Sequence, residues 1–150
     1  IHTNDAAGAV TRLVDMGVEP FLVASSIIGI LAQRLVRTLC PECKQPYEAT
    51  EEEVLELGLS PDMVGRNPQF WRGEGCKSCL TTGYSGRLGI HELLHPSDEV
   101  RQLILENVDS NTIKQKAKTQ GMRTLREDGA QKVLAGLTSS AEVLRVTTEV

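Results

Sequence analysis

Cys40-Pro-Glu-Cys43 and Cys76-Lys-Ser-Cys79 are two Cys-x-x-Cys pairs, and they set the organisation of this chain. Residues 44–75 separate them. Zinc favours four ligands arranged as a tetrahedron, and a two-residue gap lets both sulfurs of one pair reach the same ion. The two pairs therefore predict one structural zinc site with all four cysteines as ligands.

Other interpretations of the cysteines stay open. Two disulfides would require an oxidising compartment, and the sequence carries no export signal. The first pair follows a predicted strand, somewhat as in glutaredoxin-like redox proteins, but a redox role leaves the second pair unexplained. The thiols could also simply be packed in the interior. A site closed by four cysteines keeps no position open for a substrate, so the predicted zinc has a structural role.

The composition is that of an ordinary globular protein. Hydrophobic residues make up 40% of the 150 residues and aromatic residues only 3%, so the core must be largely aliphatic. The formal net charge of -4 gives no general electrostatic reason to bind nucleic acid. The longest apolar stretch, from Phe21 to Ala32, is shorter than the ~20 residues that a membrane helix needs. We therefore expect no nucleic-acid partner and no transmembrane segment.

The residues before the first cysteine pair predict two helices and a strand. Asn4 and Asp5 can cap an amphipathic helix, and Pro20 can open a second, short helix. Residues 29–38 predict a strand, because residues 30–36 are apolar apart from a glutamine and an arginine.

The remaining residues predict a turn-rich region followed by a helical tail. Thr50 and Glu53 form a capping box that opens a helix between the cysteine pairs. Five glycines in residues 73–89 predict tight turns, and residues 87–94 predict a strand. In the tail, Ser97 and Asp109 are helix-starting residues, and Thr124 with Glu127 and Ser139 with Glu142 form two further capping boxes.

A series of motifs stands in a defined order along nearly the whole chain. The motifs are Ile1-His-Thr-Asn-Asp-Ala-Ala-Gly8, Thr11-Arg-Leu13, Asp15-Met-Gly-Val-Glu-Pro-Phe21, Ala32-Gln-Arg-Leu-Val-Arg37, Gly83-Tyr-Ser-Gly-Arg87, Gly89-Ile-His-Glu-Leu-Leu94, Arg126-Glu-Asp-Gly129 and Glu142-Val-Leu-Arg-Val-Thr147. The series closely resembles the C-terminal part of the type II secretion ATPase, the GspE family. The assembly ATPase of type IV pili, the PilB family, is similar enough to be the alternative, and the run at residues 6–11 favours secretion.

The resemblance implies an α/β fold in three consecutive parts. Residues 1–39 would form the end of a RecA-like ATPase core. Residues 40–95 would form an inserted tetracysteine zinc subdomain, and residues 96–150 a C-terminal helical subdomain.

The resemblance also implies a homo-hexameric motor in the cytoplasm, peripheral to the bacterial inner membrane. In such motors ATP hydrolysis drives assembly of a pilus-like fibre through contact with inner-membrane secretion platform proteins. The family's "His box" falls on His2 and Thr3, which are the candidate catalytic residues. A hydrogen-bond donor near the transferred phosphoryl group would stabilise its developing charge.

The departures from the family pattern limit what this chain does alone. It contains no Gly-x-x-x-x-Gly-Lys-Ser/Thr phosphate loop and no apolar strand ending in the metal-binding carboxylate that partners such a loop. ATP and magnesium would therefore be bound only by the complete protein, and this chain should be inactive alone. The chain begins at Ile1 rather than Met, so we expect a fragment. A competing hypothesis is a non-enzymatic zinc module that mediates assembly with membrane partners.

Overall fold

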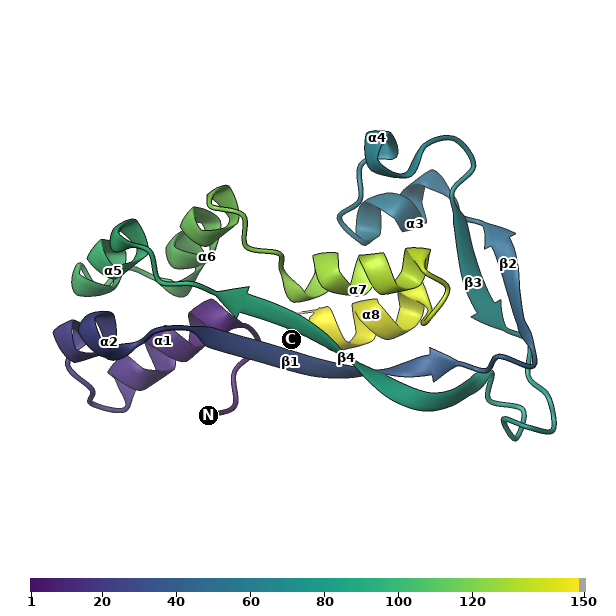
Figure 1. Cartoon of the computed structure of the whole chain (residues 1–150), viewed down its shortest axis with the longest axis horizontal. Helices are drawn as coiled ribbons and strands as arrows, with labels where there is room; N and C mark the ends of the chain where they lie inside the picture. The colour runs from purple at the N-terminus through teal and green to yellow at the C-terminus, as the bar shows by residue number, and fades with distance from the viewer. Residues whose placement is uncertain (149–150) are drawn as a thin grey trace. The chain divides into compact units, whose positions relative to one another are not determined.

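A computed structural model of the chain describes residues 1–148 and has the expected mixed α/β architecture. The chain divides into two units, each built from two separate segments. The aliphatic unit consists of Ile1–Gln33 with His91–Thr124, and the cysteine unit consists of Arg34–Ile90 with the described residues from Leu125 onward. Two long strands, β1 (Ile30–Leu39) and β4 (Tyr84–Leu94), pair with each other (Figure 1), and each contributes residues to both units.

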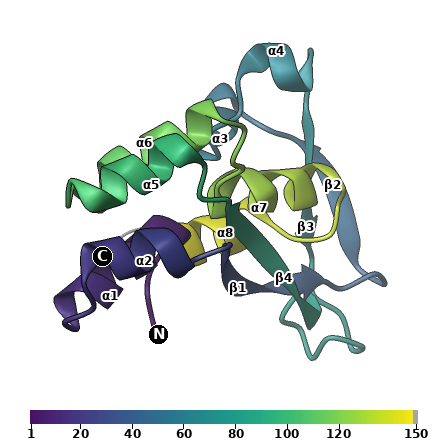
Figure 2. The ribbon, with the colours of Figure 1, turned by 60° about the vertical axis from the view of Figure 1, so that its left-hand side comes forward.

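Helices dominate the aliphatic unit. They are α1 (Ala6–Asp15), α2 (Pro20–Ser26), α5 (Asp98–Leu105) and α6 (Ser110–Thr119). α1 contacts α2 and α6, while α5 contacts α2 and α6. The side-by-side course of α5 and α6 is visible in Figure 2.

The predicted start signals of these helices are confirmed. The carboxylate of Asp5 accepts from the backbone N–H of Gly8 at 2.8 Å, and α2 begins at Pro20. Ser97 accepts from the third residue of α5, and Asp109 from the third residue of α6. Each acceptor satisfies one of the N–H groups that the first turn of a helix leaves unpaired.

The interior of the aliphatic unit is a single cluster of small and branched apolar side chains. Its buried members are Ala6, Ala7, Val10, Val23, Ala24, Leu94, Val100, Ile104, Ile113 and Ala117. No aromatic residue belongs to this cluster, as the composition predicts.

The cysteine unit combines short strands with short helices. Its elements besides β1 and β4 are β2 (Lys44–Glu48), α3 (Glu51–Glu56), α4 (Pro61–Val64), β3 (Gln69–Gly73), α7 (Leu125–Leu134) and α8 (Ser140–Thr147). β2 and β3 pair antiparallel, with Tyr47 opposite Phe70. The sequence pattern did not predict this pair, because Pro46 in β2 is a residue that strands normally exclude from their interior. The predicted helix after Thr50 is α3, and its capping box is present.

The last two helices pack against each other, and α7 also packs against β3. Gly129 on α7 lies against α8, where a Cβ atom would stand only 2.5 Å from Cγ1 of Val143. The turn after α7 meets β3, since a Cβ on Gly136 would lie 3.1 Å from the indole nitrogen of Trp71. The ammonium of Lys44 donates to the carbonyl of Gly136 at 3.0 Å.

The helical tail is therefore divided between the units, with α5 and α6 in the aliphatic unit and α7 and α8 in the cysteine unit. The predicted parts 1–39, 40–95 and 96–150 are consecutive in the chain, whereas each unit joins two separated segments. The functional roles of the three predicted parts stay predictions.

Candidate metal centre

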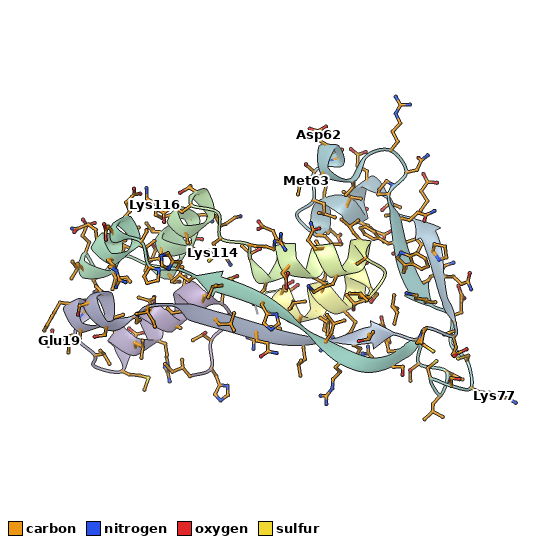
Figure 3. The ribbon with its side chains drawn as sticks, in the orientation of Figure 1. Glu19, Asp62, Met63, Lys77, Lys114 and Lys116 are labelled. Atoms are coloured by element: carbon orange, nitrogen blue, oxygen red, sulfur yellow. The ribbon has the colours of Figure 1, made fainter. Side chains whose placement is uncertain are left out.

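The four cysteines stand where strands of the cysteine unit end and begin. Cys40 follows β1 directly, and Cys43 directly precedes β2. Cys76 and Cys79 lie in the connection between β3 and β4. Each pair closes a tight turn, because Lys44 N–H donates to the carbonyl of Cys40 at 3.0 Å and Thr81 N–H to that of Cys76 at 2.8 Å. Lys77, labelled in Figure 3, is exposed within the second turn.

The two turns are held together by backbone hydrogen bonds and by close backbone packing. The N–H of Cys40 donates to the carbonyl of Gly83 at 3.0 Å, and that of Glu74 to the carbonyl of Cys43 at 3.2 Å. Gly73 and Gly83 pass so close that a Cβ on Gly73 would stand 2.1 Å from the Gly83 carbonyl oxygen. Gly83 also has φ 82°, a conformation that glycine adopts without steric cost. The glycine-rich segment therefore supplies the close approach that brings the pairs together.

The four sulfur atoms form one cluster. The Sγ atoms of Cys40 and Cys76 are 3.8 Å apart, those of Cys43 and Cys79 are 3.9 Å apart, and those of Cys76 and Cys79 are 3.7 Å apart. All four lie within 4.8 Å of one another. A tetrahedron with zinc–sulfur bonds of about 2.3 Å has sulfur–sulfur edges of about 3.8 Å. The cluster therefore fits a tetrahedral metal ion, and four clustered cysteines could hold one.

Backbone N–H groups point at the sulfur atoms. Gly75 donates to Sγ of Cys43 at 3.3 Å, and Cys76 and Gly83 donate to Sγ of Cys79 at 3.3 and 3.2 Å. Burial raises the pKa of the Cys43 thiol to about 12. Burial acts in the same direction on Cys79, but the two N–H groups, together with hydrogen bonds from the thiols of Cys76 and Cys43, outweigh it and lower the pKa of that thiol to about 6. Donors of this kind orient metal-bound sulfur and stabilise its charge.

The sulfur geometry also bears on the competing interpretations. A disulfide bond is about 2.05 Å long, far shorter than the 3.7–3.9 Å between neighbouring sulfur atoms in the cluster. A redox pair needs two cysteines, whereas this cluster brings all four together. Four soft thiolate donors in tetrahedral arrangement suit zinc or iron rather than the hard cations magnesium and calcium.

His2 and Thr3, the candidate catalytic residues, belong to the aliphatic unit, whereas the cysteines belong to the cysteine unit. His2 is exposed and Thr3 is half-buried. The Thr3 hydroxyl donates to the backbone carbonyl of Asp5 at 2.8 Å, immediately before α1. The two residues thus occupy the entry of a capped helix.

Two buried carboxylates have long-range partners that the sequence does not reveal. Glu92 on β4 is 1% exposed and accepts from the backbone N–H of Ala6 at 3.0 Å. Glu142 on α8 is 2% exposed and binds two arginines, Arg37 and Arg145. Ala6 is 86 residues from Glu92, and Arg37 is 105 residues from Glu142, so no local pattern could have found these two contacts.

The Glu142 contacts correct one prediction. Ser139 caps α8 by accepting from the N–H of Glu142, but the carboxylate does not return to the backbone as a capping box requires. It accepts from the backbone and guanidinium of Arg37 and from the guanidinium of Arg145. Burial disfavours the ionised carboxylate, yet the arginine hydrogen bonds outweigh burial and lower its pKa to about 2. Arg37 is thus a structural partner, and its guanidinium also lies 4.2 Å from the Tyr84 ring centroid.

The described residues include no helix that is both long and apolar enough to cross a membrane.

Comparison with known proteins relates the whole chain to one family. A family model described as Type II/IV secretion system protein matches residues 1–145. The chain is 50% identical over 149 residues to type II secretion system protein E of Pseudomonas aeruginosa, covering 99% of this chain and 29% of that protein. It is 47% identical over 150 residues to type II secretion system ATPase E of Vibrio cholerae, again 99% of this chain and 29% of the other. It is 47% identical over 149 residues to the type IV pilus assembly ATPase PilB of Thermus thermophilus, with 99% and 17% covered. The chain thus spans less than a third of the length of these relatives.

Proposed function

Because this chain belongs to the type II/IV secretion system protein family, we propose that it forms the C-terminal part of a hexameric ATPase motor that powers type II protein secretion. The 50% identity to a type II secretion system protein E over 99% of the chain supports this branch of the family. The motor would lie in the cytoplasm against the inner membrane, bind platform proteins there, and drive assembly of a pseudopilus.

We propose further that Cys40, Cys43, Cys76 and Cys79 hold one structural zinc. The observation that carries this proposal is the convergence of four sulfur atoms within 4.8 Å from two sequence-distant pairs. When bound, zinc would cross-link the connections between the strands. The resulting four-sulfur site has no open coordination position, so the metal would stabilise the fold without taking part in ATP hydrolysis.

The ATPase assignment concerns the complete protein. Residues 1–39 would finish its RecA-like core, with residues 40–95 as the zinc subdomain and 96–150 as the helical subdomain. Groups outside this sequence would bind the phosphates of ATP and magnesium, because the chain contains no phosphate loop. His2, with Thr3 beside it, would stabilise the charge on the transferred phosphoryl group by hydrogen bonding.

Elemental analysis tests the zinc proposal directly. The chain, purified under reducing conditions without a chelator, should contain about one zinc per molecule, as a closed four-cysteine site requires. A folded chain without any tetrahedral metal would overturn the proposal. Iron in place of zinc would overturn only the identity of the metal.

Genetic complementation tests the motor. The complete protein should restore secretion in a bacterium that lacks its type II secretion ATPase, and a His2→Ala variant should not. Type IV pilus assembly is the second candidate, supported by the 47% identity to PilB. Restoration of pili, rather than of secretion, would favour that candidate over the first.

A further inference from the structure

A buried carboxylate holds the start of α1 from across the sequence. Oε1 of Glu92 accepts from the backbone N–H of Ala6, the first residue of α1, at 3.0 Å. Glu92 is 1% exposed, and Ala6 is fully buried. Burying a carboxylate is costly unless its charge is stabilised, so its place at a helix N-terminus needs a reason. The positive end of the helix dipole contributes to that stabilisation, and the carboxylate in turn fixes the position of the helix start.

A second carboxylate acts at the same helix end. Asp5 caps α1 through Gly8 N–H, and its other oxygen binds the ammonium of Lys114 at 3.0 Å. Lys114 lies on α6 (Figure 3). The entry of α1 is therefore tied both to β4, through Glu92, and to α6, through Lys114.

The fixed region reaches almost to the candidate catalytic residues. Ala6 and Ala7 lie in the apolar cluster of the unit, and the Thr3 hydroxyl donates to the carbonyl of Asp5. Only Asn4 separates Thr3 from Asp5, and His2 directly precedes Thr3. Displacement of the start of α1 would therefore displace His2 with it.

We propose that Glu92 is a positioning residue for the ATPase reaction, which acts by fixing the start of α1 and thereby the backbone from which His2 projects. This inference rests on the proposed function, since it requires His2 to act in ATP hydrolysis. Glu92 does not touch the nucleotide in this mechanism. Its effect comes from geometry, because a shift of about 1 Å in a catalytic group can reduce turnover about 100-fold.

Three substitutions in the complete ATPase separate position from charge. Glu92→Gln keeps an oxygen acceptor at the same reach, so kcat should stay within about threefold of wild type. Glu92→Asp keeps the charge but withdraws the oxygen by one methylene, and Glu92→Leu removes the acceptor. Both should lower kcat roughly 10- to 100-fold, with KM for ATP changed less than about twofold. Val100→Ala, which truncates another buried side chain of the same unit, is the control for general destabilisation and should leave kcat unchanged.

A double-mutant cycle tests whether Glu92 acts through His2. In a His2→Ala background, Glu92→Asp should reduce kcat little further, because both changes remove the same contribution. Additive losses would overturn the inference, and so would a Glu92→Asp variant with wild-type kcat. Unchanged kcat in His2→Ala alone would instead overturn the proposed role of His2, on which the inference depends.

Hydrogen exchange gives a readout that does not depend on turnover. In Glu92→Asp and Glu92→Leu the amide of Ala6 should exchange at least tenfold faster, while the Ile104 and Ala117 amides keep their protection. Uniform loss of protection across the unit would show a general structural role and overturn positioning. Unchanged exchange at Ala6 would also overturn it.

Discussion

The aliphatic unit and the cysteine unit are stabilised by different kinds of interaction. The aliphatic unit buries one continuous cluster of apolar side chains from helices and strand ends. The cysteine unit buries apolar residues as well, such as Leu57 and Phe70, but where its strands turn it places a cluster that consists of cysteines alone. The cysteine unit also contains the buried carboxylate of Glu142, which forms ion pairs with Arg37 and Arg145.

The difference shows that burial of apolar side chains alone does not stabilise the cysteine unit. The elements between the two cysteine pairs are short: β2 and β3 have five residues each, α3 has six and α4 has four. Short elements present little apolar surface, so metal cross-links and charged hydrogen bonds replace it in many small domains. Removing a bound metal, truncating a buried apolar side chain or neutralising a buried charge should therefore affect the two units differently.

The largest difference should follow removal of the metal. Chelation, or Cys76→Ser, should cost the cysteine unit at least about 4 kcal/mol, a loss typical of removing a structural metal. The single tryptophan, Trp71, reports on this unit, so its fluorescence should change before the aliphatic unit unfolds. Amide exchange in α1 and α6 measures the other unit and should stay slow. Ser78→Ala, an exposed change in the same turn, is the matched control. An unchanged melting temperature in Cys76→Ser would contradict a structural metal.

An intermediate effect, confined to the aliphatic unit, should follow Ile113→Ala. Ile113 is 1% exposed on α6, and truncating a buried isoleucine to alanine costs about 2–5 kcal/mol. Urea unfolding should show this loss, and the zinc content of the chain should not change. Leu105→Ala on α5 removes a side chain that is 47% exposed and should cost less than about 0.5 kcal/mol. Equal losses in the two variants would argue against the apolar cluster as the main support of this unit.

The smallest effect should come from Glu142→Gln in the cysteine unit. Hydrogen bonds to a charged group contribute about 1.5–3 kcal/mol to the free energy of unfolding. The side chains of Arg37 and Arg145 are partly exposed to solvent, which screens their charge, so we expect a loss at the lower end of this range. The folded-state pKa of Glu142, about 2, lies below its ordinary value of 4.5. Its contribution is therefore complete above pH 4.5 and disappears as the pH falls through about 2.

Thermal unfolding of both proteins between pH 2 and pH 8 checks this dependence. The gap between wild type and Glu142→Gln should be constant from pH 6 to pH 8 and should narrow below pH 4.5. Glu48→Gln, an exposed change on β2, should leave no gap at any pH. A gap that widened in acid would mean that the sign of the pKa shift is wrong.

The parts that sequence predicts best are those with local causes. Helix starts at Asp5, Pro20, Ser97 and Asp109 follow from side chains that reach only a few residues, and the strand at residues 30–36 follows from its apolar run. The gathering of the four cysteines also follows from local rules, because each pair has the spacing of a metal ligand pair. The β2–β3 pair was not predicted because Pro46 is a residue that strands normally exclude from their interior.

The parts that sequence could not predict depend on contacts between distant residues. Glu92 looks like any strand residue until Ala6 is placed beside it, and Glu142 was interpreted as a capping residue because Arg37 is far away in the chain. The assignment of α5 and α6 to one unit and of α7 and α8 to the other has the same origin. Local patterns specify elements, whereas the partners of buried charges emerge only from the fold.

Because each unit is built from two separated segments, the two units are completed at different times during synthesis on the ribosome. The aliphatic unit needs residues up to Thr124, and the cysteine unit needs α7 and α8 from Leu125 onward. Translation therefore completes the aliphatic unit first. All four thiols, however, have left the ribosome once Cys79 has emerged, well before the helices that complete their unit. Free thiols are open to oxidation during that interval, and early capture of a metal ion would protect them until α7 and α8 are synthesised.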